Sequence, residues 1–232
     1  MKKIITIVGS TSEITKCVCQ NINISESIHV NLLGRMPPNW INNFPNVSFR
    51  HCDMNEVTDL ESYFKEINAE ADFSGLVYLP SSQFGRLPLI ETSREQIREI
   101  IQVSLISAIE TVQSYIRTPP KIGSVILFSS QAATFGGNKI SAYAAAKGGI
   151  ESFVKGVARE LGPMKIRINA LSPGLIKTET FFKYAAASDD ISVSVPLGRL
   201  GDPKDVANAI SWLLSSDSEY ISGAIIPITG GR

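Results

Sequence analysis

The residue pattern with the clearest chemistry in this chain is Tyr143 followed four positions later by Lys147, in the segment YAAAK. Residues four apart on a helix lie on one face, so the lysine ammonium and the tyrosine phenol are neighbours. A free tyrosine loses its proton only at about pH 10, and a nearby cation stabilises the phenolate and lowers that value. The pair is therefore a candidate general acid for the oxygen of a carbonyl group whose carbon gains a hydride. A surface pair without a chemical role is the alternative interpretation.

A second candidate group lies upstream, where the segment VILFSS ends a predicted strand in Ser129 and Ser130. A serine hydroxyl at such a strand end can donate a hydrogen bond to a substrate carbonyl. Serines are also common turn residues, so this pattern alone does not separate the two roles.

The hydrophobic pattern of the chain predicts the elements that must position these side chains. Short runs rich in β-branched residues predict seven strands, at 3–8, 29–33, 47–51, 75–79, 124–128, 167–171 and 224–228. Helical patterns predict helices at 13–21, 56–68, 93–116, 142–161 and 204–215. Residues 34–46 are too short and too rich in proline for a full crossover helix, so a loop or a stunted helix is expected there.

Strands that alternate with helices indicate crossover connections and a parallel sheet. We therefore predict a single-domain α/β protein over residues 1–232, a Rossmann-type doubly wound seven-stranded parallel sheet with helices on both faces. Ligands of such sheets bind in the crevice beyond the carboxyl ends of the strands. The formal net charge of zero argues against nucleic acid or an anionic membrane as a partner. Three cysteines without zinc-like spacing predict no metal site and a cytoplasmic location, and no apolar run is long enough to span a bilayer.

Two later segments join the serines and YAAAK in a recognisable order: NALSPGLIKTE (169–179) and VPLGRLGDPKDVANAISWLLSSDSEYISGAIIPITGG (195–231). Together they resemble the short-chain dehydrogenase/reductase family over essentially the whole chain. The resemblance implies that Ser130 orients a substrate carbonyl, that Tyr143 protonates it, and that Lys147 lowers the tyrosine pKa and bonds the nicotinamide ribose. It also implies that the nicotinamide ring is held by Pro173, Gly174, Ile176 and Thr178.

The chain departs from the family on its central helix and after its fourth strand. Ser104 stands where the family has an asparagine that anchors a water in a proton relay. It is either a shorter relay residue or a small residue that lets two helices pack closely. The family's Asn-Asn-Ala-Gly segment is Tyr78-Leu79-Pro80-Ser81 here, so this turn is expected to be built differently and to contact a cofactor at Pro80 through backbone carbonyls.

The predicted phosphate loop VGSTSEIT (8–15) keeps only the first of the family's three glycines. Glu13 replaces the second glycine, and its carboxylate should point away from the pyrophosphate because like charges repel. Thr15 replaces the third glycine and should push the following helix slightly outward. Hydroxyls and backbone amides at a helix N-terminus offer a substitute anion site, although Ser12 also suits a simple helix cap. The candidate cofactor-binding residues of the loop are Gly9, Ser10, Thr11, Ser12 and Ile14.

The residues after the second and third strands bear on the choice of cofactor. Gly34 stands where an NAD-preferring relative has an acidic residue, and Arg35 beside it can pair with a 2′-phosphate. NADP(H) is therefore favoured, with NAD(H) as the alternative cofactor and a solvated surface arginine as the alternative role. Asp53 matches the family's adenine-contacting aspartate or caps a turn.

Within the family, SAYAAAKGGIESFVKGVARELG and VPLGRLG are most similar to 3-oxoacyl-[acyl-carrier-protein] reductases. That resemblance implies NADPH-dependent reduction of a ketone, a 3-oxoacyl thioester of a fatty-acid or specialised polyketide-type pathway, to a secondary alcohol. It also implies a short substrate lid at about 180–198, a homodimer or homotetramer, and docking of an acidic carrier protein at Lys121, although Met164 replaces the second basic docking residue. An NAD(P)-dependent sugar or secondary-alcohol dehydrogenase and a non-catalytic subunit with a degenerate cofactor loop remain alternatives.

Overall fold

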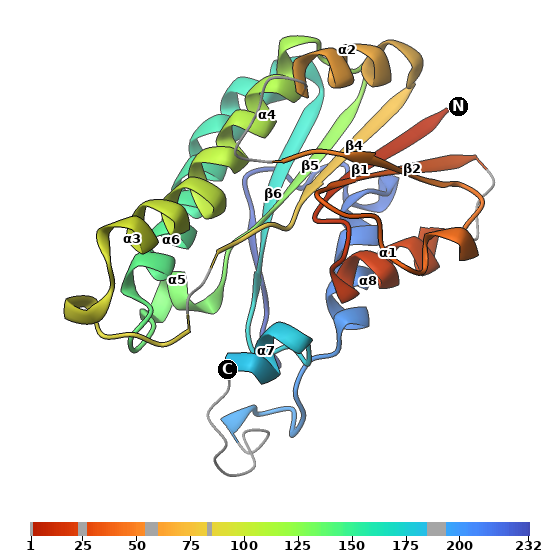
Figure 1. The fold of residues 1–232 in the computed structure, drawn as a ribbon. Coiled ribbons are helices and arrows are strands. Elements are labelled where there is room, and N and C mark those ends of the chain that lie inside the picture. The colour runs from red at the N-terminus through yellow and green to blue at the C-terminus, as the bar shows by residue number, and fades with distance from the viewer. Residues whose placement is uncertain (1, 23–26, 54–59, 83–84, 185–193) are drawn as a thin grey trace.

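The computed structural model describes residues 2–22, 27–53, 60–82, 85–184 and 194–232. At its centre lies a seven-stranded sheet in the order β3-β2-β1-β4-β5-β6-β7, with every neighbouring pair parallel (Figure 1). The strands are β1 (Lys3–Val8), β2 (Ile28–Gly34), β3 (Val47–His51), β4 (Phe73–Tyr78), β5 (Gly123–Phe128), β6 (Ile166–Pro173) and β7 (Ile225–Ile228). The order reverses between β1 and β4, so the predicted doubly wound parallel sheet is confirmed.

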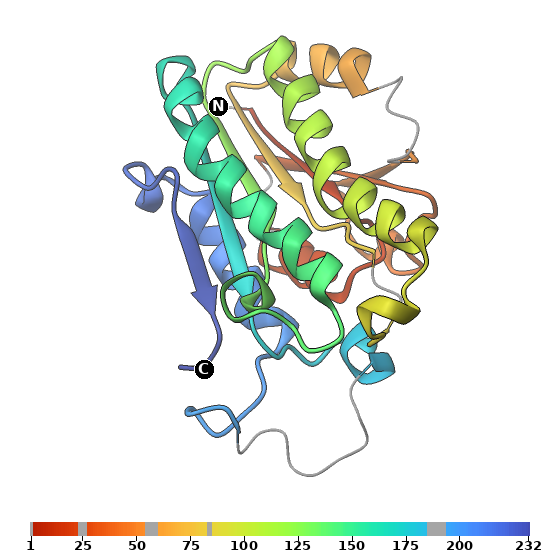
Figure 2. The same ribbon diagram turned by 90° about the vertical axis from the view of Figure 1, so that its left-hand side faces the viewer.

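Helices cover both faces of this sheet, as predicted (Figures 1 and 2). One face carries α1 (Glu13–Ile22) and α8 (Pro203–Leu213), and the other carries α2 (Leu60–Glu70), α4 (Ser107–Arg117) and α6 (Ser141–Leu161). Each face has its own apolar core. All residues of β4 and β5 are buried, as the central strands of a parallel sheet must be when helices pack on both sides.

The segment 34–46 forms the expected stunted helix, the single 3₁₀ turn η1 (Ile41–Asn43). The buried rings of Trp40 and Phe44 flank it, with their centroids 5.6 Å apart in an edge-on arrangement. These two aromatic side chains pack into the α1 and α8 side of the core, where they supply the apolar cover that a full crossover helix would give.

The long helix predicted at 93–116 is interrupted. It consists of α3 (Arg94–Ile101), a π-helical turn η4 (Gln102–Ile106) and α4. In this turn the Ser107 amide bonds the Gln102 carbonyl, five residues back. The Val103 carbonyl, which that amide would meet in an α-helix, accepts the Tyr78 hydroxyl at 2.8 Å. The π turn is therefore accompanied by a hydrogen bond from Tyr78 of β4 to the Val103 carbonyl.

Two short helices lie beyond the carboxyl ends of the strands: α5 (Gln131–Phe135) follows β5, and α7 (Glu179–Tyr184) follows β6. The predicted lid at 180–198 begins within α7, and its central part, like the first residues of the helix predicted at 56–68, lies outside the described residues. None of the described helices is long and apolar enough to cross a membrane.

Candidate active site

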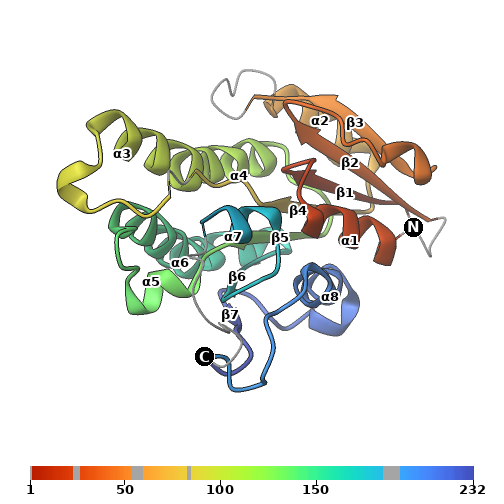
Figure 3. The same ribbon diagram turned by 60° about the horizontal axis from the view of Figure 1, so that its bottom comes forward.

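The carboxyl ends of β5 and β6 lie side by side, because Phe128 pairs with Leu171 in the sheet. Ser130 follows the end of β5, and α6, which packs on both strands, carries Tyr143 and Lys147. Figure 3 looks toward this end of the sheet, with α5, α6 and α7 around it. The strand order thus brings together residues from segments that are distant in the sequence.

Ser130, Tyr143 and Lys147 meet at this edge. The Ser130 side chain lies close enough to the Tyr143 phenol to lower its pKa, and its hydroxyl accepts the Ala132 amide at 3.2 Å as the N-cap of α5. The Lys147 Nζ lies 5.6 Å from the centroid of the Tyr143 ring and donates to the Phe128 carbonyl at 2.8 Å. The end of β5 therefore holds both helix side chains in place.

Glu151 makes a third contact of the same kind, which the sequence reasoning missed. The Ser129 hydroxyl lies 2.7 Å from Glu151 Oε1 and 3.3 Å from the Lys147 carbonyl. Glu151 follows Lys147 by four residues, as Lys147 follows Tyr143, so three successive turns of α6 contact three successive residues at the end of β5. The repeated spacing of four was the available signal in the sequence.

Burial raises the pKa of Tyr143, and the neighbouring Ser130 hydroxyl opposes that rise. The expectation that Lys147 brings the tyrosine pKa below its ordinary value is therefore not met in the protein without a cofactor. Burial lowers the pKa of Lys147 to about 7, so the lysine has lost its charge before the phenol titrates. Tyr143 is consequently a protonated phenol at neutral pH.

Lys147 is 2% exposed, and its burial lowers its pKa from the usual 10.5 to about 7. An ammonium loses its hydration in such a place, so the neutral amine becomes relatively more stable. The hydrogen bond to Phe128 is available to both forms, because a neutral amine also donates. Lys147 therefore changes its charge near neutral pH.

Ser104 is 1% exposed and lies within the π turn. Its hydroxyl accepts the Ser82 amide at 3.1 Å, which ties η4 to the chain after β4. Ser104 is thus hydrogen-bonded to the chain after β4. This contact is compatible with both predicted roles of Ser104, the proton relay and close helix packing.

The loop after β1 closes through side chains where the family uses glycine. Gly9 has φ +102°, a conformation that favours glycine, and it keeps the tight turn. Thr15 is fully buried, and its hydroxyl donates to the Gly9 carbonyl at 2.7 Å, so it braces the turn from within. Ser12 accepts the Ile14 amide at 3.2 Å, which is the capping contact, whereas Thr11 is exposed.

Glu13 is exposed and turns toward the chain after β6. Its Oε2 accepts the Glu179 backbone amide at 3.0 Å, at the first residue of α7. Thr178 caps the same helix, because its hydroxyl accepts the Phe181 amide at 3.1 Å. The carboxylate that replaces the second loop glycine therefore joins the predicted phosphate loop to α7.

Ser10 fills the space beside Gly34 that the sequence left open for a phosphate. Its hydroxyl is 3% exposed and donates to the Met36 carbonyl at 2.8 Å, and a Cβ on Gly34 would collide with it. Any acidic side chain at position 34 would therefore displace Ser10. Arg35, directly after the end of β2, is exposed.

The rebuilt turn after β4 packs closely on the phosphate loop. The Leu79 amide donates to the Val8 carbonyl at 3.1 Å, and the Leu79 Cβ lies 3.2 Å from where a Cβ on Gly9 would stand. Pro80 and Asp53 are both half-buried, after β4 and β3 respectively. Pro80 thus lies beside the loop after β1, at the point where the strand order reverses, whereas Asp53 follows a strand that β2 separates from β1.

The turn after β6 has Pro173 at the strand end, and the Gly174 amide bonds the Ile228 carbonyl at 3.0 Å. A Cβ on Gly174 would stand 3.3 Å from Gln131 Oε1, so the missing side chain leaves room for this amide. Ile176 is 7% exposed and packs into the core, so a cofactor would meet it mainly through its backbone.

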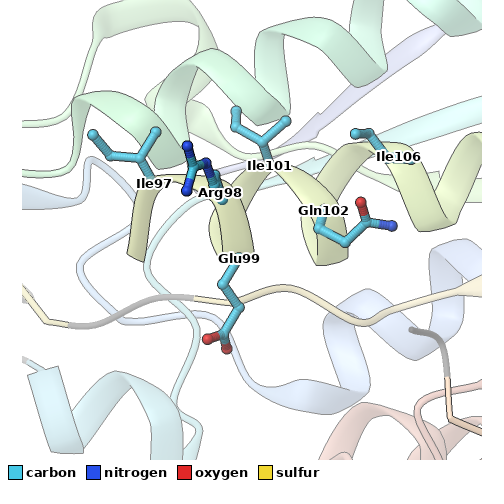
Figure 4. A pocket seen from close by; sticks show the side chains of 6 residues that line it. All are labelled: Ile97, Arg98, Glu99, Ile101, Gln102 and Ile106. Carbon is cyan, nitrogen blue, oxygen red and sulfur yellow. The ribbon is translucent and has the colours of Figure 1, made fainter. Parts of the chain in front are cut away.

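A shallow hollow of about 500 Å³ lies on α3 and η4, away from these residues (Figure 4). It is lined by Ile97, Arg98, Glu99, Ile101, Gln102 and Ile106. The lining comes from successive turns of one helical segment and includes none of Ser130, Tyr143 and Lys147. We therefore place the candidate active site at the end of β5 and not at this hollow.

Similar proteins agree with this arrangement. The sequence model of a family described as enoyl-(acyl carrier protein) reductase matches residues 40–232. Carbonyl reductase family member 4 of Xenopus tropicalis is 32% identical over 184 residues, which cover 78% of this chain and 75% of the relative. The 3-oxoacyl-[acyl-carrier-protein] reductase FabG of Escherichia coli K12 is 32% identical over 187 residues, which cover 77% and 75%. The solved structure of ElxO with NADP bound superimposes with a TM-score of 0.89 at 25% identity, over 100% of this chain and 98% of that one.

The family match covers most of the chain, and both relatives exceed 30% identity over more than two thirds of it. With the doubly wound sheet and the serine, tyrosine and lysine at the end of β5, this chain belongs to the short-chain dehydrogenase/reductase family of oxidoreductases.

Proposed function

We propose that this protein is an NADPH-dependent ketoreductase that uses Ser130, Tyr143 and Lys147. The observation that carries the proposal is the arrangement at the end of β5, where the Ser130 hydroxyl neighbours the Tyr143 phenol and the Lys147 Nζ lies 5.6 Å from the centroid of the Tyr143 ring. A proton donor to a ketone must be protonated at the working pH, and the raised pKa of Tyr143 supplies that.

In the proposed reaction, a bound nicotinamide supplies the hydride to the ketone carbon. Ser130 holds the ketone oxygen by donating a hydrogen bond, and Tyr143 donates its proton to that oxygen as negative charge develops there. Lys147 stabilises the phenolate that remains when it carries its own proton, which its pKa of about 7 allows near neutral pH. Ser104 supports this arrangement through its bond to the chain after β4.

The residues present fit a dinucleotide. The loop between β1 and α1 lies at the point where the strand order reverses, which is where this fold binds nucleotides. We assign the pyrophosphate to Gly9, Ser10, Thr11, Ser12 and Ile14, the adenosine to Asp53 and Pro80, and the nicotinamide to Pro173, Gly174, Ile176, Thr178, Tyr143 and Lys147. The solved ElxO structure with NADP bound supports this assignment by its similarity over the whole chain.

NADP(H) is the proposed cofactor, with NAD(H) as the alternative. Arg35 is exposed at the end of β2, where its guanidinium can pair with a 2′-phosphate. The acidic side chain that would favour an unphosphorylated ribose is absent, because position 34 is glycine. The charge of Arg35 and the absence of this acidic side chain thus favour the phosphorylated cofactor.

For the substrate we propose a 3-oxoacyl thioester, carried by an acyl carrier protein in a fatty-acid or specialised polyketide-type pathway of the cytoplasm. The similarity to FabG supports this class, whereas the similarity to a carbonyl reductase supports a carbonyl substrate without specifying its class. Docking of a carrier at Lys121 finds less support, since Lys121 is already paired with Asp72 at 2.8 Å. We further propose a homodimer or homotetramer as the working assembly.

The decisive experiment combines binding and turnover. NADPH and NADH are titrated by fluorescence, and reduction of S-acetoacetyl-N-acetylcysteamine is then followed with wild type, Tyr143→Phe and the control Tyr220→Phe, whose side chain is fully exposed. We expect NADPH to bind more tightly than NADH, and Tyr143→Phe to keep NADPH affinity while losing roughly 10²- to 10⁴-fold in kcat. Absence of binding of either nucleotide at millimolar concentration would instead support a non-catalytic subunit.

A further inference from the structure

Gln131 carries a polar atom that the protein itself does not pair. Among the described residues, four buried side-chain polar atoms have no hydrogen-bond partner, on Asn68, Ser74, Glu110 and Gln131. The first three belong to α2, β4 and α4, whereas Gln131 is the first residue of α5, directly after Ser130. Its Nε2 is therefore an unpaired donor at the carboxyl end of the sheet.

The Gln131 amide lies between the two loops of the candidate site. On one side its backbone follows Ser130, whose hydroxyl neighbours Tyr143. On the other side its Oε1 lies 3.3 Å from where a Cβ on Gly174 would stand, so the amide reaches the turn after β6. The amide thus belongs to the residue that follows Ser130 in the chain and lies against the turn after β6.

A buried donor without a partner is costly, and a ligand oxygen that pairs with it removes that cost. A site of this kind discriminates against analogues that lack the matching oxygen, because the donor is then left unpaired again. The expected discrimination for one such donor is roughly 10- to 100-fold.

We propose that Gln131 is a specificity-determining residue whose Nε2 donates to a second oxygen of the substrate, while Ser130 and Tyr143 hold the ketone oxygen. The inference rests on the proposed ketoreductase function and names the feature its substrate must have: an acceptor oxygen near the ketone, as in a 3-oxoacyl thioester. The two carbonyl oxygens of such a 1,3-dicarbonyl unit can lie on one edge of the molecule, so the adjacent residues Ser130 and Gln131 serve them together.

The carboxamide oxygen of a bound nicotinamide is the other acceptor that this crevice would hold. Gln131 lies near both Gly174, which is assigned to the nicotinamide, and Ser130, which is proposed to hold the ketone. We commit to the substrate because the backbone of Gln131 directly follows Ser130. The two acceptors give different kinetic outcomes. Pairing of Gln131 with the substrate affects the KM for the ketone, whereas pairing with the nicotinamide carboxamide affects the KM for NADPH.

The test uses two matched ketones, S-acetoacetyl-N-acetylcysteamine and S-(3-oxobutyl)-N-acetylcysteamine, which has a methylene in place of the thioester carbonyl. Wild type, Gln131→Met and Gln131→Glu are compared, with Gln113→Met on the exposed side of α4 as the matched control. Methionine keeps the length of the side chain without a donor, and glutamate keeps acceptors only. We expect both Gln131 variants to lose roughly 10- to 100-fold in kcat/KM on the thioester, with unchanged kcat/KM on the thioether ketone and unchanged KM for NADPH.

An equal loss on both ketones, no loss on either, or a raised KM for NADPH alone would overturn the inference while leaving the ketoreductase function intact. Wild type that reduces neither ketone would overturn both. A measurement without variants guards against misfolding: in wild type, the 3-hydroxybutyryl thioester should inhibit roughly 10-fold more tightly than the 3-hydroxybutyl thioether. Equal inhibition constants would also contradict the role of Gln131.

Discussion

Tyr143 and Lys147 have pKa values displaced in opposite directions, and burial causes both displacements. Burial favours the uncharged form of any group, which is the protonated phenol of tyrosine and the deprotonated amine of lysine. At neutral pH, Tyr143 of the free protein is thus protonated, whereas Lys147 is partly deprotonated. In this state Tyr143 carries the proton that the proposed reduction of a ketone requires.

The displaced pKa of Lys147 predicts a pH-dependent stability of the free protein. The unfolded chain keeps the lysine proton up to about 10.5, whereas the native protein releases it near 7, so the unfolded state binds more protons between these values. Stability therefore rises with pH across that window, by up to about 1.4 kcal/mol per unit from this group. Below pH 7 both states are charged and the contribution is flat.

The measurement is urea unfolding of wild type and Lys147→Met between pH 6 and pH 9, with Lys155→Met, an exposed lysine on the same helix, as the control. Lys147→Met should lack the rise that wild type and the control share above pH 7. A parallel pH dependence in all three proteins would show that Lys147 keeps its ordinary pKa in the folded state.

At the level of elements, α6 and the end of β5 act as one unit. Phe128, Ser129 and Ser130 contact Lys147, Glu151 and Tyr143, so a shift of the helix along the strand would break all three contacts together. Glu151 is the one of these helix residues with no role in the proposed proton transfer. We expect it to be a positioning residue that acts on Ser130 through the neighbouring Ser129.

Removing the acceptor at Glu151 should slow catalysis without weakening cofactor binding. We expect Glu151→Ala to lower kcat by roughly 10-fold with an unchanged KM for NADPH, and Glu151→Gln to restore most of the rate, because its amide oxygen still accepts the Ser129 hydroxyl. The control is Glu160→Ala, an exposed residue on the same helix. Loss of stability with an unchanged kcat in the alanine variant would mean that the contact serves only the fold.

The elements themselves were predictable because their signals are local. Apolar periodicity located the strands and the helices, and the prolines of 34–46 indicated the stunted helix that Trp40 and Phe44 flank. The π turn at Ser104 was not predictable, since it depends on Tyr78, a residue of β4 that reaches it only in the folded chain. The role proposed for Gln131 was not predictable for the same reason, because only the folded structure shows that its side-chain amide has no partner.

At the scale of the whole molecule, one contact joins two segments that are far apart in the sequence, and no local sequence pattern indicates it. Glu13 and Glu179 are 166 positions apart, yet the Glu13 carboxylate accepts the Glu179 amide and so joins the loop after β1 to the helix after β6. The sequence predicted that this carboxylate would avoid the phosphates, and the structure shows the group to which it turns. A dinucleotide in this fold extends from the loop after β1 toward the end of β6, so it must share this region with a negative charge.

We therefore expect Glu13→Gln and Glu13→Gly to bind NADPH about 3- to 10-fold more tightly than wild type at low ionic strength, because a repelling charge is removed. Glutamine still offers an oxygen to the Glu179 amide, so equal gains in the two variants would assign the effect to charge, and a larger gain with glycine would assign it to the contact with α7. Fluorescence titration at low and high salt measures this, with the exposed Glu95→Gln as control. The gain should shrink at high salt if charge causes it, and unchanged or weaker affinity in both variants would contradict the expectation.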